Sequence, residues 1–233
     1  MSQRILPAPD RFAICPFGGP ILPFYDGVFE AAWVLLNPFM RPTVPPVERF
    51  LQETRDASPA ALCAACEPVR WSHVRELAQL PSLAAIDVAL RTGIGGLAPQ
   101  FADKALTKQL DEALARHGLV VPGEGVFPEL QHEAVLSFIQ SLGHEWLWVG
   151  DELCTERELR WIEELKPANA GLDHLRGNLF TPDKSLLWTV HWDSHFSLIC
   201  SSREVVARLS AHPGLEGFAC GPATEIYWSL AHD

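Results

Sequence analysis

Residues 185–200, SLLWTVHWDSHFSLIC, carry the pattern from which the central sheet is predicted. Apolar side chains recur at alternate positions, which is the period of a β-strand. The alternating residues expected on its core face are Trp188, Val190, Trp192 and Phe196. The segment 178–181, NLFT, precedes it across the turn-forming run 182–184, so the two segments predict an antiparallel hairpin. The residues 195–201, HFSLICS, either continue the second strand or return as a third.

A polar trio, His191, Asp193 and His195, lies at alternate positions in the same stretch. On a straight strand the three side chains share one face, spaced about 6.5–7 Å apart, and their nitrogen and oxygen atoms suit zinc or iron. His174 precedes the hairpin and is the nearest candidate for a further ligand. If Asp193-Ser194 is instead a turn, the polar side chains have a local role, and the two histidines face each other across the hairpin mouth. Both alternatives stay open, and we prefer the turn.

A second candidate site is the segment RTGIGG (91–96). Successive glycine N–H groups can form a nest for an anion, and an arginine can add a bidentate contact to carboxylate or phosphate. The segment lacks the Lys-Ser/Thr ending of a phosphate-binding loop. The simpler interpretation is a helix end at which glycine supplies a positive φ. The candidate anion- or ligand-binding residues are Arg91, Thr92, Gly93, Gly95 and Gly96.

The pair Cys63 and Cys66 forms a CxxC motif, which is used in redox pairs and zinc sites. No second CxxC is present, so the usual zinc pattern is missing. The two cysteines lie in an alanine-rich segment beside Leu62, where helical spacing places them on one buried face. We therefore expect a structural role in packing.

The rest of the chain is dominated by helical patterns. Residues 1–25 are rich in proline and glycine and predict an extended arm, and 41–47 predicts a loop. The segment 145–151, EWLWVGD, predicts a strand, and the last residues, from 218, predict a further strand or helix at the edge. Helices are expected at 26–37 after Asp26, 59–66 after Ser58, from Ser72, at 83–90 after Ser82, and at 100–117, 129–142, 155–165 and 201–211.

These elements predict an α+β fold. A helical N-terminal half, residues 1–143 with its proline-rich arm, packs on a small, mainly antiparallel sheet with C-terminal helices. The second part, residues 144–233, contains the central hairpin, and the two parts are expected to form one compact unit. The strands cluster in sequence instead of alternating with helices, which argues against a doubly wound parallel sheet.

Charge and hydropathy restrict the partners. Asp and Glu outnumber Lys and Arg by 29 to 18, and no basic cluster is present, so we expect no nucleic-acid partner. No apolar run of about 18 residues exists, and none is therefore expected to span a membrane. The N-terminal residues lack the apolar core of a secretory signal. We therefore expect a cytoplasmic protein with reduced cysteines.

Five motifs together resemble a known family. They are LNPFMRP (36–42), PVRWSHV (68–74), IDVALRTGIGGL (86–97), SLGHEWLWVGD (141–151) and LLWTVHWDSHFSL (186–198). Through them most of the chain resembles the YwbB-like group, uncharacterised bacterial proteins defined only as a domain of unknown function. The resemblance implies a bacterial cytosolic protein and carries no activity. The tail from Leu179 to Leu209 is also similar, in its order of strands and helix, to small bacterial immunity-type domains.

Two functional hypotheses follow. The first is a non-catalytic binding or interaction protein, immunity- or regulator-like, with a protein partner or a small ligand. It rests on the acidic composition and on the lack of a strong catalytic motif. The alternative is a small metal-dependent enzyme in which His191, Asp193 and His195, with His174, hold zinc or iron for hydrolysis or oxidation.

Overall fold

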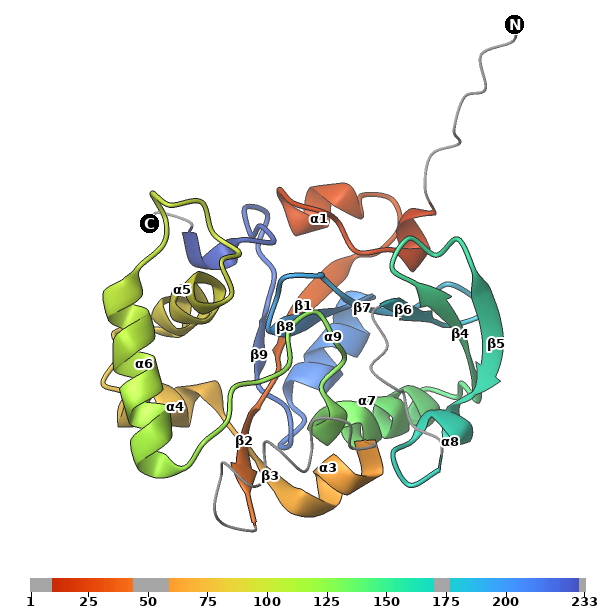
Figure 1. The fold of residues 1–233 in the computed structure, drawn as a ribbon. Helices are drawn as coiled ribbons and strands as arrows, with labels where there is room; N and C mark the ends of the chain where they lie inside the picture. The colour runs from red at the N-terminus through yellow and green to blue at the C-terminus, as the bar shows by residue number, and fades with distance from the viewer. Residues whose placement is uncertain (1–9, 44–58, 170–176, 231–233) are drawn as a thin grey trace, which may run out of the picture.

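A computed structural model describes residues 10–43, 59–169 and 177–230. Its centre is a seven-stranded sheet with the strand order β5-β4-β6-β7-β8-β1-β9, in which every neighbouring pair is antiparallel (Figure 1). The strands are β1 (Ala31–Leu36), β4 (Trp146–Asp151), β5 (Arg157–Trp161), β6 (Gly177–Phe180), β7 (Leu187–Val190), β8 (Phe196–Ser201) and β9 (Gly217–Ala219). The predicted α+β class with a mainly antiparallel sheet is confirmed.

Helices surround this sheet, and a separate two-stranded ribbon pairs β2 (Phe39–Pro42) with β3 (Cys66–Val69). The helices are α1 (Ile21–Phe24), α3 (Pro59–Ala65), α4 (Trp71–Leu77), α5 (Leu83–Gly93), α6 (Lys104–His117), α7 (Glu129–Ser141), α8 (Ile162–Leu165) and α9 (Arg203–Ser210). Two short 3-10 turns occupy Arg11–Ala13 and Trp228–Leu230. No helix in the described ranges is long and apolar enough to cross a membrane.

The predicted hairpin is confirmed, and a third strand follows it. Strand β6 pairs with β7 through Asn178 opposite Thr189, and β7 pairs with β8 through Val190 opposite Ser197. The chain therefore reverses within residues 191–195, so the turn, and not the straight strand, is the structure at Asp193. The placement of Trp192 on the core face is wrong, because its side chain lies on this turn and is 47% exposed.

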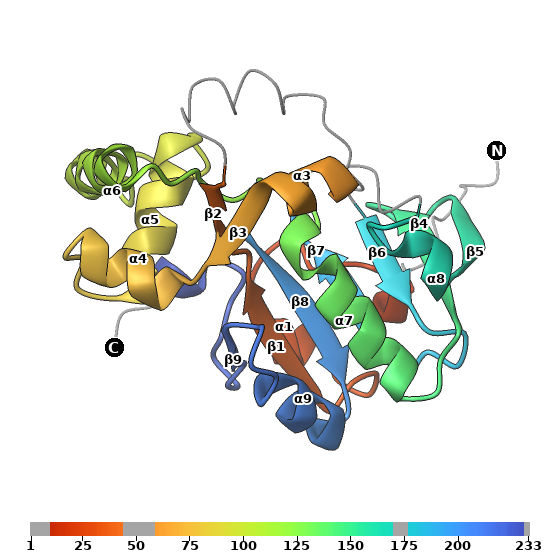
Figure 2. The same cartoon turned by 90° about the horizontal axis from the view of Figure 1, so that it is seen from below.

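The central strands of the sheet, β1, β6, β7 and β8, are buried on both faces. On β1, Trp33 and Leu35 pack into one apolar cluster, whereas Val34 and Leu36 pack into the other. The first cluster also contains residues of α7, α8 and α9, and Figure 2 shows α7 and α9 across that face. The second contains residues of α1, α4, α5 and α6. Burial on both faces explains why the central strands are apolar at almost every position.

Local chemistry explains the helices that the sequence predicted well. The Ser82 side chain accepts a hydrogen bond from the Ala85 N–H and begins α5. Asp103 caps α6 in the same way, which explains its start four residues later than expected. Gly118, with φ 62°, ends α6 in the left-handed conformation. The helices expected at 83–90, 100–117 and 129–142 are thus confirmed with shifted ends.

Two predicted helices are wrong. The segment 26–37 contains the strand β1 instead of a helix. Its apolar residues face both sides of the sheet, and their spacing therefore resembles that of a helix. The segment 155–165 contains the edge strand β5, followed by the single helical turn α8. Here Trp161 pairs with Trp146 across the strands, and these cross-strand contacts outweigh the local capping pattern that begins at Thr155.

Three smaller expectations also need correction. Helix α4 begins at Trp71, one residue before the proposed cap, because the carboxylate of Glu216 accepts hydrogen bonds from the Trp71 and Ser72 N–H groups. Helix α9 is capped by Ser202 instead of the preceding serine. Cys66 lies in β3, so the CxxC motif spans a helix and a strand. Ser58 and residues 44–47 of the predicted loop lie outside the described ranges.

The division of the chain at residue 143 stays a prediction. Strand β1, which belongs to the first part, lies between β8 and β9 of the second part. The predicted proline-rich arm contains the short helix α1 within its described portion.

Candidate functional site

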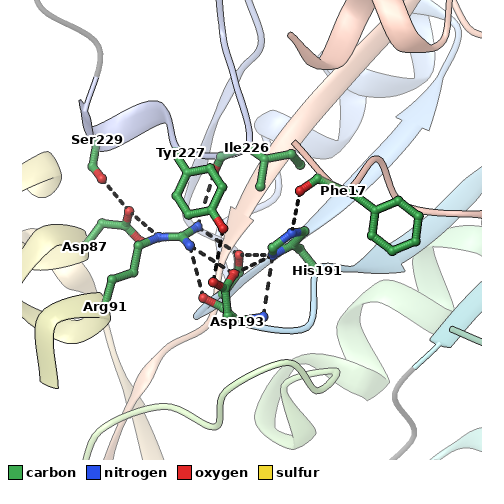
Figure 3. Close-up of polar contacts among 9 residues, drawn as sticks. Phe17, Asp87, Arg91, His191, Asp193, Ile226, Tyr227 and Ser229 are labelled. Atoms are coloured by element: carbon green, nitrogen blue, oxygen red, sulfur yellow. Dashed lines mark hydrogen bonds and ion pairs between the residues drawn. The ribbon is translucent and has the colours of Figure 1, made fainter. Parts of the chain in front are cut away.

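The turn between β7 and β8 meets the C-terminal end of α5 through Arg91. Figure 3 shows its guanidinium between Asp87 of the same helix and Asp193 of the turn. The Nε atom donates to Asp87 Oδ2 at 2.9 Å, and Nη1 donates to Asp193 at both the backbone oxygen, 3.0 Å, and Oδ1, 3.1 Å. Nη2 donates to Ser194 Oγ at 2.8 Å and to the Ile226 carbonyl at 3.1 Å. All five N–H donors of this fully buried arginine therefore have acceptors.

The Asp193 carboxylate is shared among three side chains. Its Oδ1 atom lies 2.6 Å from His191 Nδ1 in addition to the arginine contact, and its Oδ2 accepts a hydrogen bond from the Tyr227 hydroxyl at 3.1 Å. The Nε2 atom of His191 donates to the Phe17 carbonyl at 3.1 Å. The Tyr227 ring also lies 4.6 Å from the guanidinium carbon, a cation–π contact (Figure 3). Both oxygens of the carboxylate and both nitrogens of the imidazole thus have partners within the protein.

Burial and pairing act oppositely on the two carboxyl groups. For Asp193, burial favours the neutral form, but the hydrogen bond and charge of His191, together with Arg91, outweigh it and lower the pKa below its usual value. For Asp87, burial raises the pKa more than Arg91 and the Ser229 hydroxyl lower it. The cluster is held by ionic pairing at Asp193, while Asp87 bears the larger cost of desolvation.

A neighbouring loop fixes the position of this turn. The N–H of Gly125 donates to the Ser194 carbonyl at 2.9 Å, and its backbone has φ 62°. A Cβ atom placed on Gly125 would lie 2.2 Å from the carbonyl oxygen of Trp192. Only glycine permits this close approach, so the backbone of the loop before α7 packs directly against the turn.

His195 does not join this network. It directly precedes β8, is 2% exposed, and lines a cleft of about 270 Å³ beside α5 and α6. Its Nδ1 atom is buried without a hydrogen-bond partner among the described residues. Burial, with a contribution from Arg91, lowers the pKa of His195 to about 4. The remaining residues lining the cleft are Ala89, Leu90, Gly93, Ile94, Thr107, Leu110, Asp111 and Val121.

The structure divides the predicted metal ligands. His191 and Asp193 meet, but His195 lines the separate cleft, and His174 lies outside the described residues. Within the described parts of the chain, no three His, Cys, Asp or Glu side chains are grouped to hold a metal ion. Binding of zinc or iron stays a prediction that this geometry does not favour.

The predicted anion segment is the end of α5. The N–H groups of Ile94, Gly95 and Gly96 donate to the carbonyls of Leu90, Thr92 and Arg91, which are the last carbonyls of that helix. The hydroxyl of Thr92 accepts from the Asp103 N–H. The side chain of Arg91 is directed inward to the buried network, and Gly93 lines the His195 cleft. Anion binding by this segment stays a prediction, with its donors engaged within the protein.

Sequence reasoning missed Asp87, Tyr227 and Ser229. The i, i+4 spacing of Asp87 and Arg91 within an apolar helix was the available indication of a buried pair. The two C-terminal residues come from a segment more than 130 residues beyond α5. No sequence pattern connects that segment to the helix.

The comparisons with known proteins provide a family and no activity. No curated protein and no solved structure matches the chain. These comparisons do not confirm the resemblance to the YwbB-like group. A model of a family described as "Protein of unknown function (DUF2711)" matches residues 18–230, nearly the whole chain and every element around the buried network. The chain therefore belongs to the DUF2711 family of proteins of unknown function.

Proposed function

We propose that this protein is a non-catalytic binding protein, regulator- or immunity-like, of the bacterial cytosol, and that it holds a small ligand in the cleft lined by His195. The observation that carries the proposal is the buried Nδ1 atom of His195, which has no partner among the described residues. A buried polar atom without a partner is costly, and a ligand that donates or accepts a hydrogen bond there removes the cost.

The polar groups of the neighbouring turn and of Arg91 are engaged within the protein, which supports a binding role over a catalytic one. The atoms that a reaction at HWDSH would need, the Asp193 oxygens and the His191 nitrogens, are already bonded within the protein. Arg91 has no donor left for a substrate. Arg91, His191 and Asp193 engaged in this way stabilise a fold and position the turn, whereas a catalytic site requires groups directed at the substrate.

The lining of the cleft indicates the class of ligand. Its walls are mostly apolar, and the side chains of Ile94 and Val121 are about two-fifths exposed. Its polar groups are Thr107, Asp111 and the neutral imidazole of His195, and no lysine or arginine of the described ranges lines it. A small molecule with an apolar body and a neutral or cationic polar group complements these walls.

The experiment uses tryptamine, which joins an apolar double ring to an ammonium group, and measures its affinity by titration calorimetry at pH 7. Asp111→Asn and His195→Phe should each weaken binding by about tenfold, since each removes one polar contact. Glu112→Gln is the matched control, because it removes the same charge from the neighbouring position of α6, outside the cleft. Equal affinities in all four proteins, or no binding to the wild type, would overturn the proposal.

A further inference from the structure

A second cleft lies at the β4–β5 end of the sheet, on the face that also carries residues of α5 and α6. It has a volume of about 300 Å³ and lies between the N-terminal 3-10 turn, β4, β5, β6 and the β6–β7 turn. The charged and aromatic side chains that line it, beside Pro182, are Asp10, Phe12, Trp148, Arg157, Phe180 and Lys184. None of these residues belongs to the His195 cleft or to the Arg91 network.

Aromatic rings form one wall of this cleft. Trp148 and Phe180 are opposite each other on β4 and β6, and their ring planes differ by only 20°. Phe12 meets Phe180 edge to face, with ring centroids 5.5 Å apart. Rings in these arrangements present both faces and edges, which suits stacking against another planar group.

Two cations are held against these rings. The guanidinium of Arg157 lies 5.9 Å from the Trp148 centroid and 5.8 Å from the Phe180 centroid. The ammonium of Lys184 lies 4.1 Å from the Phe12 centroid. The backbone of Lys184 has φ 63° and its N–H donates to the Thr181 carbonyl, so the tight turn directs this lysine to the cleft.

The charges in the cleft are not balanced. Asp10 is the acidic residue of the lining, and its Oδ2 lies 3.4 Å from Arg157 in a half-exposed pair. Among the described residues, no carboxylate lies within ion-pair distance of Lys184. The lining of the cleft therefore has one net positive charge. This sign is opposite to that of the chain as a whole, whose net charge is −11.

We propose that this cleft binds an organic anion with a planar aromatic body, such as an aromatic carboxylate. The body stacks on the Trp148 and Phe180 wall, and the anionic group pairs with the ammonium of Lys184 and with the guanidinium of Arg157 beside its Asp10 contact. Cations already held over aromatic faces lose little side-chain freedom when an anion arrives. The two clefts share no lining residue, and the His195 cleft is proposed to take a neutral or cationic group, so the two sites are independent.

Indole-3-acetate tests this proposal, with indole-3-ethanol as its neutral isostere, by titration calorimetry on the full chain. Indole-3-acetate should bind about tenfold more tightly than the alcohol, and Lys184→Gln and Arg157→Gln should each remove about that factor. Lys108→Gln is the matched control, since it removes one exposed positive charge on α6. Circular dichroism and the melting temperature establish that each variant is folded.

The location of binding is read from the indole N–H resonance of Trp148, assigned with Trp148→Phe. Its chemical shift should move with indole-3-acetate and saturate with the calorimetric affinity. Equal affinity for the acid and the alcohol, an equal loss in Lys108→Gln, or an unmoved Trp148 resonance would each overturn the proposal. The Asp111 and His195 variants should leave this affinity unchanged, so failure here is distinguishable from failure of the His195 cleft.

Discussion

Arg91 and Asp193 are 102 residues apart in the sequence and are joined by two contacts from one guanidinium nitrogen, to the carboxylate and to the backbone carbonyl of the aspartate. The first contact pairs the charges, and the second fixes the direction of the peptide at the turn. Helix α5 and the β7–β8 turn are thereby locked together at a fixed orientation, with the His195 cleft beside them.

Replacement of Arg91 by methionine should strongly destabilise the protein, since it leaves Asp87 and Asp193 buried without their cation. Breaking a buried pair on one side costs about 3–5 kcal/mol. The measurement is the free energy of unfolding from urea titration. Lys108→Met, which breaks the exposed pair with Glu112, is the control and should change that free energy by less than about 0.5 kcal/mol. A loss below about 1 kcal/mol in Arg91→Met would contradict a structural role for the network.

Gly125→Ala should displace the turn that carries Asp193. The variant combines a strained positive φ with a collision against the Trp192 carbonyl, at a total cost of about 3 kcal/mol. Gly27→Ala separates the two effects, because Gly27 has φ 73° and open space around its Cα, so it should cost only about 1 kcal/mol. Thermal and urea unfolding of both variants provide the comparison. Equal losses would show that the contact between loop and turn is not tight.

The periodicity of the sequence was sufficient for the elements with one buried face. Helices α6 and α7 were predictable because most of their polar and apolar residues separate by position. Helix α5 was predictable from its Ser82 cap, and the β6–β7 hairpin from the turn-forming run 182–184 between its strands. Strand β1 was not predictable in this way. Its residues pack into apolar clusters on both faces of the sheet, so the sequence AAWVLL shows no alternation of polar and apolar residues. A pattern that is apolar throughout fits a buried helix and a central strand equally well.

The site shows the same limit. The sequence singled out HWDSH and RTGIGG as separate candidates, and the structure brings Arg91 of one into contact with Asp193 of the other. That contact depends on how α5 packs against the sheet, which no local spacing encodes. Tyr227 and the Ile226 carbonyl come from a third segment, so the full set of partners of Arg91 and Asp193 is visible only in three dimensions.

Wild-type protein purified without a histidine tag should carry no more zinc or iron than His191→Ala/His195→Ala after mild reconstitution. The reason is that the nitrogens of His191 and the oxygens of Asp193 are already bonded, and that His195 lines another cavity. Elemental analysis by mass spectrometry measures the content, with His117→Ala/His212→Ala as a control for loss of surface histidines. Stoichiometric metal that is lost only in the first double variant would instead support the metal-dependent enzyme.

Acid should destabilise the protein between pH 6.5 and 4 through its buried histidines. Burial lowers the pKa of His195 and of His132 to about 4, whereas the ordinary value for an unfolded chain is about 6.5. Between these values the unfolded chain binds more protons than the folded one, so the free energy of unfolding falls as the pH falls. Each histidine contributes a loss of up to about 3 kcal/mol on reaching pH 4.

His195→Phe keeps a ring in the same space and removes the proton-binding group, so its unfolding free energy should depend less steeply on pH than that of the wild type. Urea titrations at pH 7, 5.5 and 4.5 give the two curves, and their difference isolates His195 from Asp87, Asp193 and His132, which both proteins share. His117→Phe, at the exposed C-terminal end of α6, controls for the loss of a histidine as such. Parallel curves for the wild type and His195→Phe would show that His195 titrates as freely in the folded protein as in the unfolded chain, and would remove the neutral imidazole on which the ligand class of its cleft depends.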